Sequence, residues 1–246
     1  MEIIGNGMIA RGLLRYSADI NDAVVFASGV SDSTLKDQQE YDREYQMLCR
    51  VIQDCEQRDK TLVYFSSGGT VYGKRNEERK EDAPLFPETV YGRHKVRCES
   101  VIISSGGRYL IARLPTVVGQ TKSRTQLIPV LIKQAMEGHV TLFKDAERDI
   151  IGIADVARII TAILKKLKRN EIVNVASGIS VSVSDIFSAI QNNLGVKPII
   201  KIISGGDKQR FNIDKLHAYC PEITFAMDYY RNVIQNYISE QRDGRV

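Results

Sequence analysis

The chain has 246 residues, of which 43% are hydrophobic and 26% charged, as is usual for a globular protein. This length suffices for one α/β domain with a sizeable core, or for one domain and a small lobe. The formal net charge of +4 is mild and its basic residues are scattered, which argues against a nucleic-acid-binding surface.

Nothing in the sequence predicts a membrane span or an export signal. No stretch approaches the roughly 18 consecutive apolar residues of a membrane-crossing helix. The N-terminus, MEIIGNGMIA, has no basic region followed by an apolar one, so we expect no signal peptide. The cysteines show neither a CxxC pair nor a metal-like spacing with the histidines, and they are Cys49, Cys55, Cys98 and Cys220. They are typical of reduced thiols and favour a cytoplasmic protein without a bound metal.

Short β-branched runs alternate with amphipathic helices, which predicts a parallel sheet covered by helices on both faces. Strands are expected at 2–5, 23–27, 61–66, 108–114, 140–143, 150–153, 172–175 and 199–203. Helices are expected at 8–17, 38–58, 90–105, 125–137, 155–168, 183–194 and 228–239. Past residue 115 the strands become shorter and less regularly spaced, which indicates a second, smaller lobe.

A glycine-rich turn, Gly5-Asn6-Gly7-Met8-Ile9-Ala10, joins the first expected strand to the first expected helix. Small residues let the chain turn tightly into a helix and leave backbone N–H groups open to a pyrophosphate. A GxGxxA pattern alone is weak, but its place at the first strand–helix junction strengthens it. It predicts a dinucleotide site, with an ordinary tight turn as the alternative.

The strand at 61–66 runs into small hydroxyl residues, in the sequence YFSSGGTVYG. Ligands of α/β proteins bind at the carboxyl ends of parallel strands. Ser66, Ser67 and Thr70 are therefore candidate binding or catalytic residues.

Tyr91 and Lys95 lie four residues apart in an expected helix and share one face of it. A phenol, with an ordinary pKa of about 10, is no base at neutral pH, but a nearby ammonium favours phenolate. Tyr91 could then exchange a proton with a sugar or alcohol oxygen while a hydride moves. A hydroxyl from the 66–70 turn would hold that oxygen. Two residues that merely share a helix face are the alternative, and the order of the three motifs favours the chemical interpretation.

The combination of GNGMIA, FSSGGTVYG, YGRHK and RDIIGIADVA resembles the extended short-chain dehydrogenases/reductases that act on nucleotide sugars. These are epimerases, dehydratases and ketoreductases. Similar segments cover most of the chain, namely LIARLPTVVGQ, QLIPVLIKQAMEGHVTLF, IVNVASGISVSVSDIFSAIQNNLG and GDKQRFNIDKLH.

The resemblance implies an α/β fold, a Rossmann-like doubly wound parallel sheet that is shortened here. It implies an NAD(P)-binding core at 1–115 and a nucleotide-sugar-binding lobe, interleaved with the core, at 116–246. It also implies NAD or NADP as cofactor and a homodimer formed through the helices at 38–58 and 90–105.

The resemblance assigns roles residue by residue. Tyr91 is implied as the catalytic acid/base and Lys95 as its partner. Arg148, in ERDII, is implied as a contact to the substrate diphosphate, where a planar guanidinium can bind oxygens in bidentate fashion. The residues expected to contact the cofactor are Gly5, Gly7, Met8, Ile9, Arg11, Ser66, Tyr91 and Lys95.

The sequence departs from the family pattern at the catalytic hydroxyl, which normally lies four residues before the tyrosine of VYG. Gly68 occupies that position. Ser67 or Thr70 must take over, and both remain open at this point; Ser67 is also a candidate substrate contact. The Gly-Gly pair replaces the acidic pair of 4,6-dehydratases, which argues against a dehydratase.

The chain is also short near its start, because only one helix fits between Ala10 and the strand at 23–27. The family normally has two further βα units there, on the order of thirty residues or more. These units usually supply the acidic residue that holds the adenine ribose. Arg11 and Arg15 are the nearest charged residues, and they either meet a 2′-phosphate, which would favour NADP, or are solvated.

A second diphosphate-binding arginine is often found three residues before the GD pair, where this chain has Ser204. Arg210 is close by and is a candidate replacement in substrate binding.

The sequence favours a ketoreductase of a nucleotide-linked 4-keto-6-deoxyhexose. A nucleotide-sugar 4-epimerase is the alternative, because it would use the same residues. A non-catalytic nucleotide-sugar-binding relative is the third hypothesis, motivated by the short N-terminal region and by Gly68.

Overall fold

The computed structural model describes residues 1–16, 20–74, 77–121, 123, 125–242 and 244. Its central sheet has five parallel strands in the order β1-β2-β3-β4-β8. They are β1 (Glu2–Ile4), β2 (Ala23–Phe26), β3 (Thr61–Ser67), β4 (Arg108–Leu114) and β8 (Glu171–Asn174). The predicted α/β, Rossmann-like parallel sheet is confirmed.

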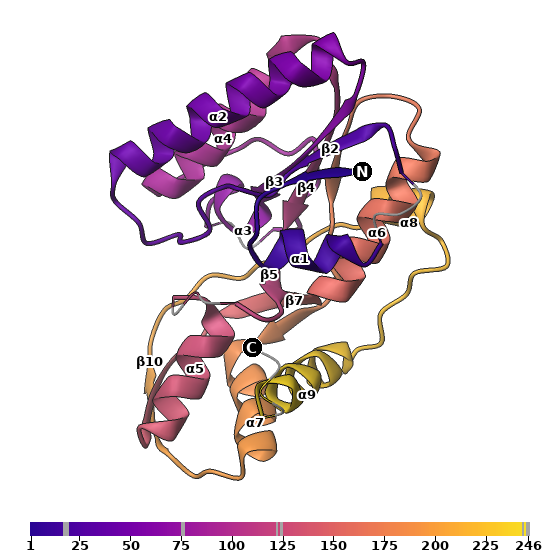
Figure 1. Cartoon of the computed structure of the whole chain (residues 1–246). Coiled ribbons are helices and arrows are strands. Elements are labelled where there is room, and N and C mark those ends of the chain that lie inside the picture. Colours follow the sequence, from indigo (N-terminus) through magenta and orange to yellow (C-terminus); the bar gives the residue numbers. More distant parts are fainter. Residues whose placement is uncertain (17–19, 75–76, 122, 124, 243, 245–246) are drawn as a thin grey trace.

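Each strand sends alternate side chains to opposite faces, and helices cover both faces (Figure 1). Val24, Leu62 and Ile111 pack under α2 (Gln38–Gln57) and α4 (Val90–Ser105). Val25 and Val63 pack on the other face, against α1 (Met8–Leu14), α6 (Ile153–Lys166) and α8 (Asp214–Tyr219). A short helix, α3 (Gly68–Val71), follows β3 directly.

The second lobe has its own apolar core. Its strands are β5 (Thr116–Val118), β7 (Glu147–Gly152) and β9 (Ser180–Ser182) in one small sheet, and β6 (His139–Phe143) with β10 (Ile199–Ile203) in another. Its helices are α5 (Leu127–Met136), α7 (Val183–Leu194) and α9 (Tyr229–Arg242). Although α6, β8 and α8 follow residue 115, they pack in the first core. The division of binding roles between 1–115 and 116–246 stays a prediction.

The short N-terminal region has a direct structural consequence, because β1 is an edge strand that pairs only with β2 among the described residues. A single helix, α1, joins β1 to β2. The predicted helix spans 8–17, and its last residue, Ser17, lies outside the described residues. The exposed edge is only three residues long, and Glu2 on it forms a 2.7 Å ion pair with Arg58. A short, charged strand discourages pairing with another chain.

None of the helices in the described part of the chain is both long and apolar enough to cross a membrane.

Candidate active site

A cavity of about 1040 Å³ opens at the carboxyl ends of the central strands and is lined by residues of both lobes. It brings together most of the residues singled out from the sequence, namely Gly7, Met8, Ile9, Arg11, Ser66, Ser67, Thr70, Tyr91, Lys95 and Arg148. Three other candidate residues, Gly5, Arg15 and Arg210, are not among the described residues that line the cavity. Tertiary packing thus joins positions up to 141 residues apart, Gly7 and Arg148, in one site.

The two glycines of the N-terminal turn have different structural roles. Gly5 has φ +125°, and a Cβ there would lie 2.4 Å from the carbonyl oxygen of Ala27. Any side chain would therefore force β1 and β2 apart. Gly7 is the N-cap of α1, and a Cβ on it would meet nothing within 4 Å. Gly5 thus closes the turn, while Gly7 leaves the cavity side of the backbone clear.

Ser66 supplies a second feature that fits a bound polar ligand. Its side chain is buried, it lines the cavity, and its hydroxyl has no hydrogen-bond partner among the described residues. Buried hydroxyls are normally paired, so an orphan at a cavity wall marks a place for a ligand group. The cleared backbone at Gly7, the Ser66 hydroxyl and the Lys95 ammonium fit a dinucleotide.

Tyr91 and Lys95 are held by a well-capped helix. Thr89 accepts a 2.9 Å hydrogen bond from the N–H of Gly92 at its start, and Gly106 ends it in the left-handed conformation. The Lys95 Nζ lies 5.5 Å from the centre of the Tyr91 ring. Both side chains are buried at the cavity wall. The predicted pairing on one helix face is present.

Burial raises the pKa of Tyr91 above its usual value, and the Glu44 carboxylate adds to the rise. The Lys95 ammonium and a hydrogen bond with the Ser67 side chain act in the opposite direction, but burial outweighs them. Tyr91 is therefore a protonated phenol at neutral pH. It is placed to donate a proton rather than to accept one.

The structure distinguishes the two hydroxyls left open by the sequence. The Ser67 side chain hydrogen-bonds Tyr91, whereas the Thr70 Oγ1 donates to the carbonyl oxygen of Ser67 over 3.3 Å. The reason for Gly68 is also visible, because a Cβ there would lie 2.5 Å from Cε1 of the buried Phe211 ring. Phe211 fills the space that a side chain at position 68 would need.

The two candidate diphosphate-binding arginines are both paired. Arg148 lines the cavity and donates 2.9 Å to Asp207 Oδ1 and 2.8 Å to the Asp207 carbonyl oxygen. Arg210 is half-exposed and pairs with Glu147 at 3.1 Å. Arg148 is thus placed to meet a ligand, in competition with Asp207. The substrate-binding roles of both arginines stay predictions.

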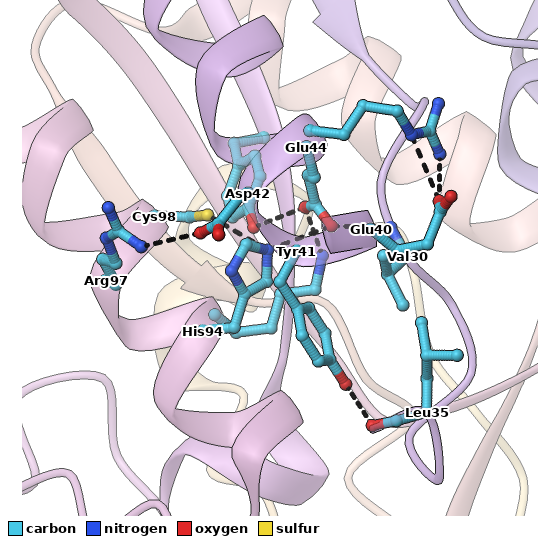
Figure 2. Close-up of polar contacts among 12 residues, drawn as sticks. Val30, Leu35, Glu40, Tyr41, Asp42, Glu44, His94, Arg97 and Cys98 are labelled. Carbon is cyan, nitrogen blue, oxygen red and sulfur yellow. Dashed lines mark hydrogen bonds and ion pairs between the residues drawn. The ribbon is translucent and has the colours of Figure 1, made fainter. Parts of the chain in front are cut away.

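Sequence reasoning missed Glu44, which is buried in α2 and lies behind Lys95. Glu44 Oε1 is 2.9 Å from the Lys95 Nζ, and Oε2 is 3.1 Å from His94 Nε2. The available signal was a carboxylate in the apolar stripe of α2, three residues after Tyr41 and four before Leu48. Figure 2 shows Glu44 and His94 pointing toward each other between α2 and α4.

Acid should remove the stabilisation that Glu44 provides. Burial alone would raise its pKa, but the Lys95 ammonium and the His94 and Lys95 hydrogen bonds lower it from 4.5 to about 2. A carboxyl group with a lowered folded-state pKa stabilises the fold above pH 4.5 and loses that contribution as the pH falls toward 2. We expect the unfolding free-energy gap between wild type and Glu44→Gln to shrink by about 1 kcal/mol between pH 6.5 and roughly 3.5, measured by urea titration.

The matched control is Glu56→Gln, which removes an exposed carboxylate from the same helix. A gap for Glu44→Gln that is constant over this pH range would contradict the ion pair.

Comparison with known proteins gives the family. The NAD dependent epimerase/dehydratase family matches residues 13–176, beginning after the glycine turn. The chain belongs to this family, which confirms the membership expected from the motifs. The predicted cofactor, NAD or NADP, is of the class named in the family description.

Two curated relatives illustrate the range of reactions in the family. The chain is 26% identical over 149 residues to an Escherichia coli dTDP-4-dehydro-6-deoxyglucose reductase, covering 56% of this chain and 47% of the relative. It is 32% identical over 148 residues to a putative UDP-glucose 4-epimerase of Methanocaldococcus jannaschii, covering 55% and 48%. The chain therefore spans about half the length of the curated relatives it matches.

Solved structures show the same fold. MoeE5 in complex with UDP-glucose and NAD has a TM-score of 0.83 at 19% identity, with 99% of this chain and 98% of that chain covered. RMD from Pseudomonas aeruginosa complexed with NADPH has a TM-score of 0.79 at 18% identity, covering 97% and 98%.

Proposed function

We propose that the chain is an NAD(P)-dependent enzyme that modifies a nucleotide-linked sugar, and within that class a reductase of a 4-keto-6-deoxyhexose. The observation that carries the proposal is Tyr91, a buried, protonated phenol that hydrogen-bonds Ser67 beside Lys95 at the cavity wall. A reduction needs a proton donor at this place. The similarity to a dTDP-4-dehydro-6-deoxyglucose reductase supports the same reaction class.

When bound, NAD(P)H would supply a hydride to the carbonyl carbon of the sugar. The carbonyl oxygen, left with the electron pair of the broken π bond, would take the proton of Tyr91. Ser67 would hold that oxygen by a hydrogen bond, and Lys95 would keep a positive charge close to the developing phenolate. Arg148 would bind the diphosphate by exchanging its contact with Asp207.

The alternative within the class is a 4-epimerase, which the similarity to a putative UDP-glucose 4-epimerase supports. An epimerase returns the hydride to the opposite face of the same sugar and gains from retaining its cofactor. In the described chain no strand lies beyond β1 in the central sheet. The βα units that would hold the adenosine half of the cofactor are therefore missing there. This argues for an exchangeable cofactor, and so for the reductase.

The first test is a fluorescence titration of the purified protein with NADPH and with NADH, followed by turnover of dTDP-4-keto-6-deoxyglucose and of UDP-glucose. Micromolar binding with consumption of NADPH by the keto sugar supports the reductase. Conversion of UDP-glucose without net cofactor consumption supports the epimerase. Binding of a nucleotide sugar without turnover of either sugar would support a non-catalytic relative. A preference for NADPH over NADH would indicate that Arg11 contacts the 2′-phosphate.

The choice of hydroxyl predicts a sharp difference between two alanine variants. Ser67→Ala should lower kcat by about 10²-fold or more, because it removes the donor beside Tyr91. Thr70→Ala is the matched control and should stay within a few-fold of wild type, because its hydroxyl is engaged with the backbone. Equal losses in both variants would show that Ser67 has no special role.

A further inference from the structure

Glu44 is a fully buried charged group beside the candidate active site. Its side chain is 0% exposed, and four groups donate to or pair with its carboxylate. They are the Lys95 ammonium at 2.9 Å, His94 at 3.1 Å, the Val30 N–H at 2.6 Å and the Tyr64 hydroxyl at 3.3 Å. A carboxylate with this many partners is fixed in position.

The ion pair of Glu44 and Lys95 lies at the border between the protein interior and the cavity. Among the described residues Lys95 lines the cavity, whereas Glu44 does not. Glu44 therefore holds the ammonium from behind and leaves its front open.

The loop after β2 rests on this pair. A Cβ on Gly29 would lie 2.7 Å from Glu44 Oε1 and 3.0 Å from Lys95 Nζ, and Val30 donates to Oε2. Gly29 and Val30 both line the cavity. The position of this wall thus depends on the same carboxylate that holds Lys95.

Glu44, His94 and Cys98 have the side-chain types of a metal site, with their ligand atoms within 4.8 Å of one another. The Lys95 ammonium, 2.9 Å from Oε1, already supplies the positive charge, and a second cation would repel it. Burial raises the pKa of the Cys98 thiol to about 12, so its uncharged form is favoured beside the Glu44 carboxylate. The geometry is that of an ion pair.

We infer that Glu44 is a positioning residue of this site: it ties the Lys95 ammonium to the loop at 29–30 and offsets part of the positive charge that Lys95 presents to Tyr91. An ammonium without Glu44 would stabilise the phenolate form and lower the pKa of Tyr91, as expected for a catalytic base. With Glu44 offsetting part of the Lys95 effect, burial keeps the phenol protonated, ready to donate to a carbonyl oxygen. The inference rests on the proposed reductase function and assigns Glu44 the task of setting the direction of proton transfer.

Tyr91 and Glu44 are surrounded by other ionisable groups that any titration must take into account. They are Tyr41 on α2, Tyr64 on β3, His94, Lys95 and Cys98 on α4, and Asp32 in the loop after β2. The formal charges that act on Tyr91 itself are Lys95, from this group, and Glu44.

The experiment needs no substrate. Tyrosinate absorbance is titrated with pH in the wild-type background and in Glu44→Gln, each with and without Tyr91→Phe, and the difference within each pair reports Tyr91 alone. We expect Tyr91 to ionise at least about 1 pH unit lower in Glu44→Gln, because Lys95 then acts on it uncompensated. His94→Gln is the matched control. It removes a neighbour of Glu44 but keeps the Glu44 carboxylate, so the ionisation of Tyr91 should be unchanged.

An unchanged Tyr91 ionisation in folded Glu44→Gln would overturn the inference and leave Glu44 a structural residue. Should that variant not fold, Glu44→Asp withdraws the carboxylate by one methylene, and an unchanged titration there would overturn the inference equally. Failure of the proposed function would appear separately, as no turnover in the assays above. If turnover is found, the alkaline limb of the kcat profile for reduction should move to lower pH in Glu44→Gln, since the protonated phenol is the active form.

Discussion

Replacing Tyr91 by phenylalanine is expected to lower kcat by about 10² to 10⁴-fold, the usual contribution of a general acid. The phenol is buried beside Lys95, and in the described site Ser67 is the hydroxyl that hydrogen-bonds it. Loss of one oxygen leaves the ring packing intact, so the dissociation constant for NADPH should be nearly unchanged. Steady-state kinetics and fluorescence titration measure the two effects separately.

Tyr45→Phe is the matched control, because Tyr45 lies on α2 with its ring 3.7 Å from the Arg97 guanidinium and outside the cavity lining. It should keep full activity. A Tyr91→Phe enzyme that retains more than a tenth of the wild-type kcat would refute the proton-donor role.

Replacing Arg113 by methionine is expected to lower the unfolding free energy by about 3 to 5 kcal/mol, because it leaves a buried carboxylate without its partner. Arg113 on β4 forms two bonds with Glu99 of α4, at 2.7 and 3.1 Å, and both side chains are nearly inaccessible to solvent. Its Nη1 also donates to the Tyr72 hydroxyl, which in turn donates to Asn174 on β8. One guanidinium therefore joins the end of α3, the strands β4 and β8, and the helix that carries Tyr91.

Urea unfolding measures this loss of stability, and two further variants serve as a surface control and as a rescue. Arg58→Met removes a half-exposed arginine paired with Glu2 and Asp54, and should cost less than about 1 kcal/mol. Adding Glu99→Leu to Arg113→Met removes the orphaned charge and should recover much of the loss. If the single Arg113→Met variant costs no more than Arg58→Met, the network contributes little to stability.

Local pattern was sufficient to predict most of the fold. The helix expected at 90–105 is found at Val90–Ser105, and the strand expected at 108–114 at Arg108–Leu114. Period-2 and period-3.6 patterns with capping residues are short-range signals, so they can be read from neighbours in the chain. The elements that were not expected, β5, β9, α3 and α8, have three to six residues each, too few for a period to show.

The sequence by itself determined the α/β fold, the family, the glycine turn and the shared helix face of Tyr91 and Lys95, because each depends on spacing along the chain. Only the tertiary structure decided that Phe211 excludes a side chain at position 68, that Ser67 is the hydroxyl beside Tyr91, and that Glu44 lies behind Lys95. Those contacts join residues from 24 to 143 positions apart, and their energies depend on burial and on which charges meet in the folded chain.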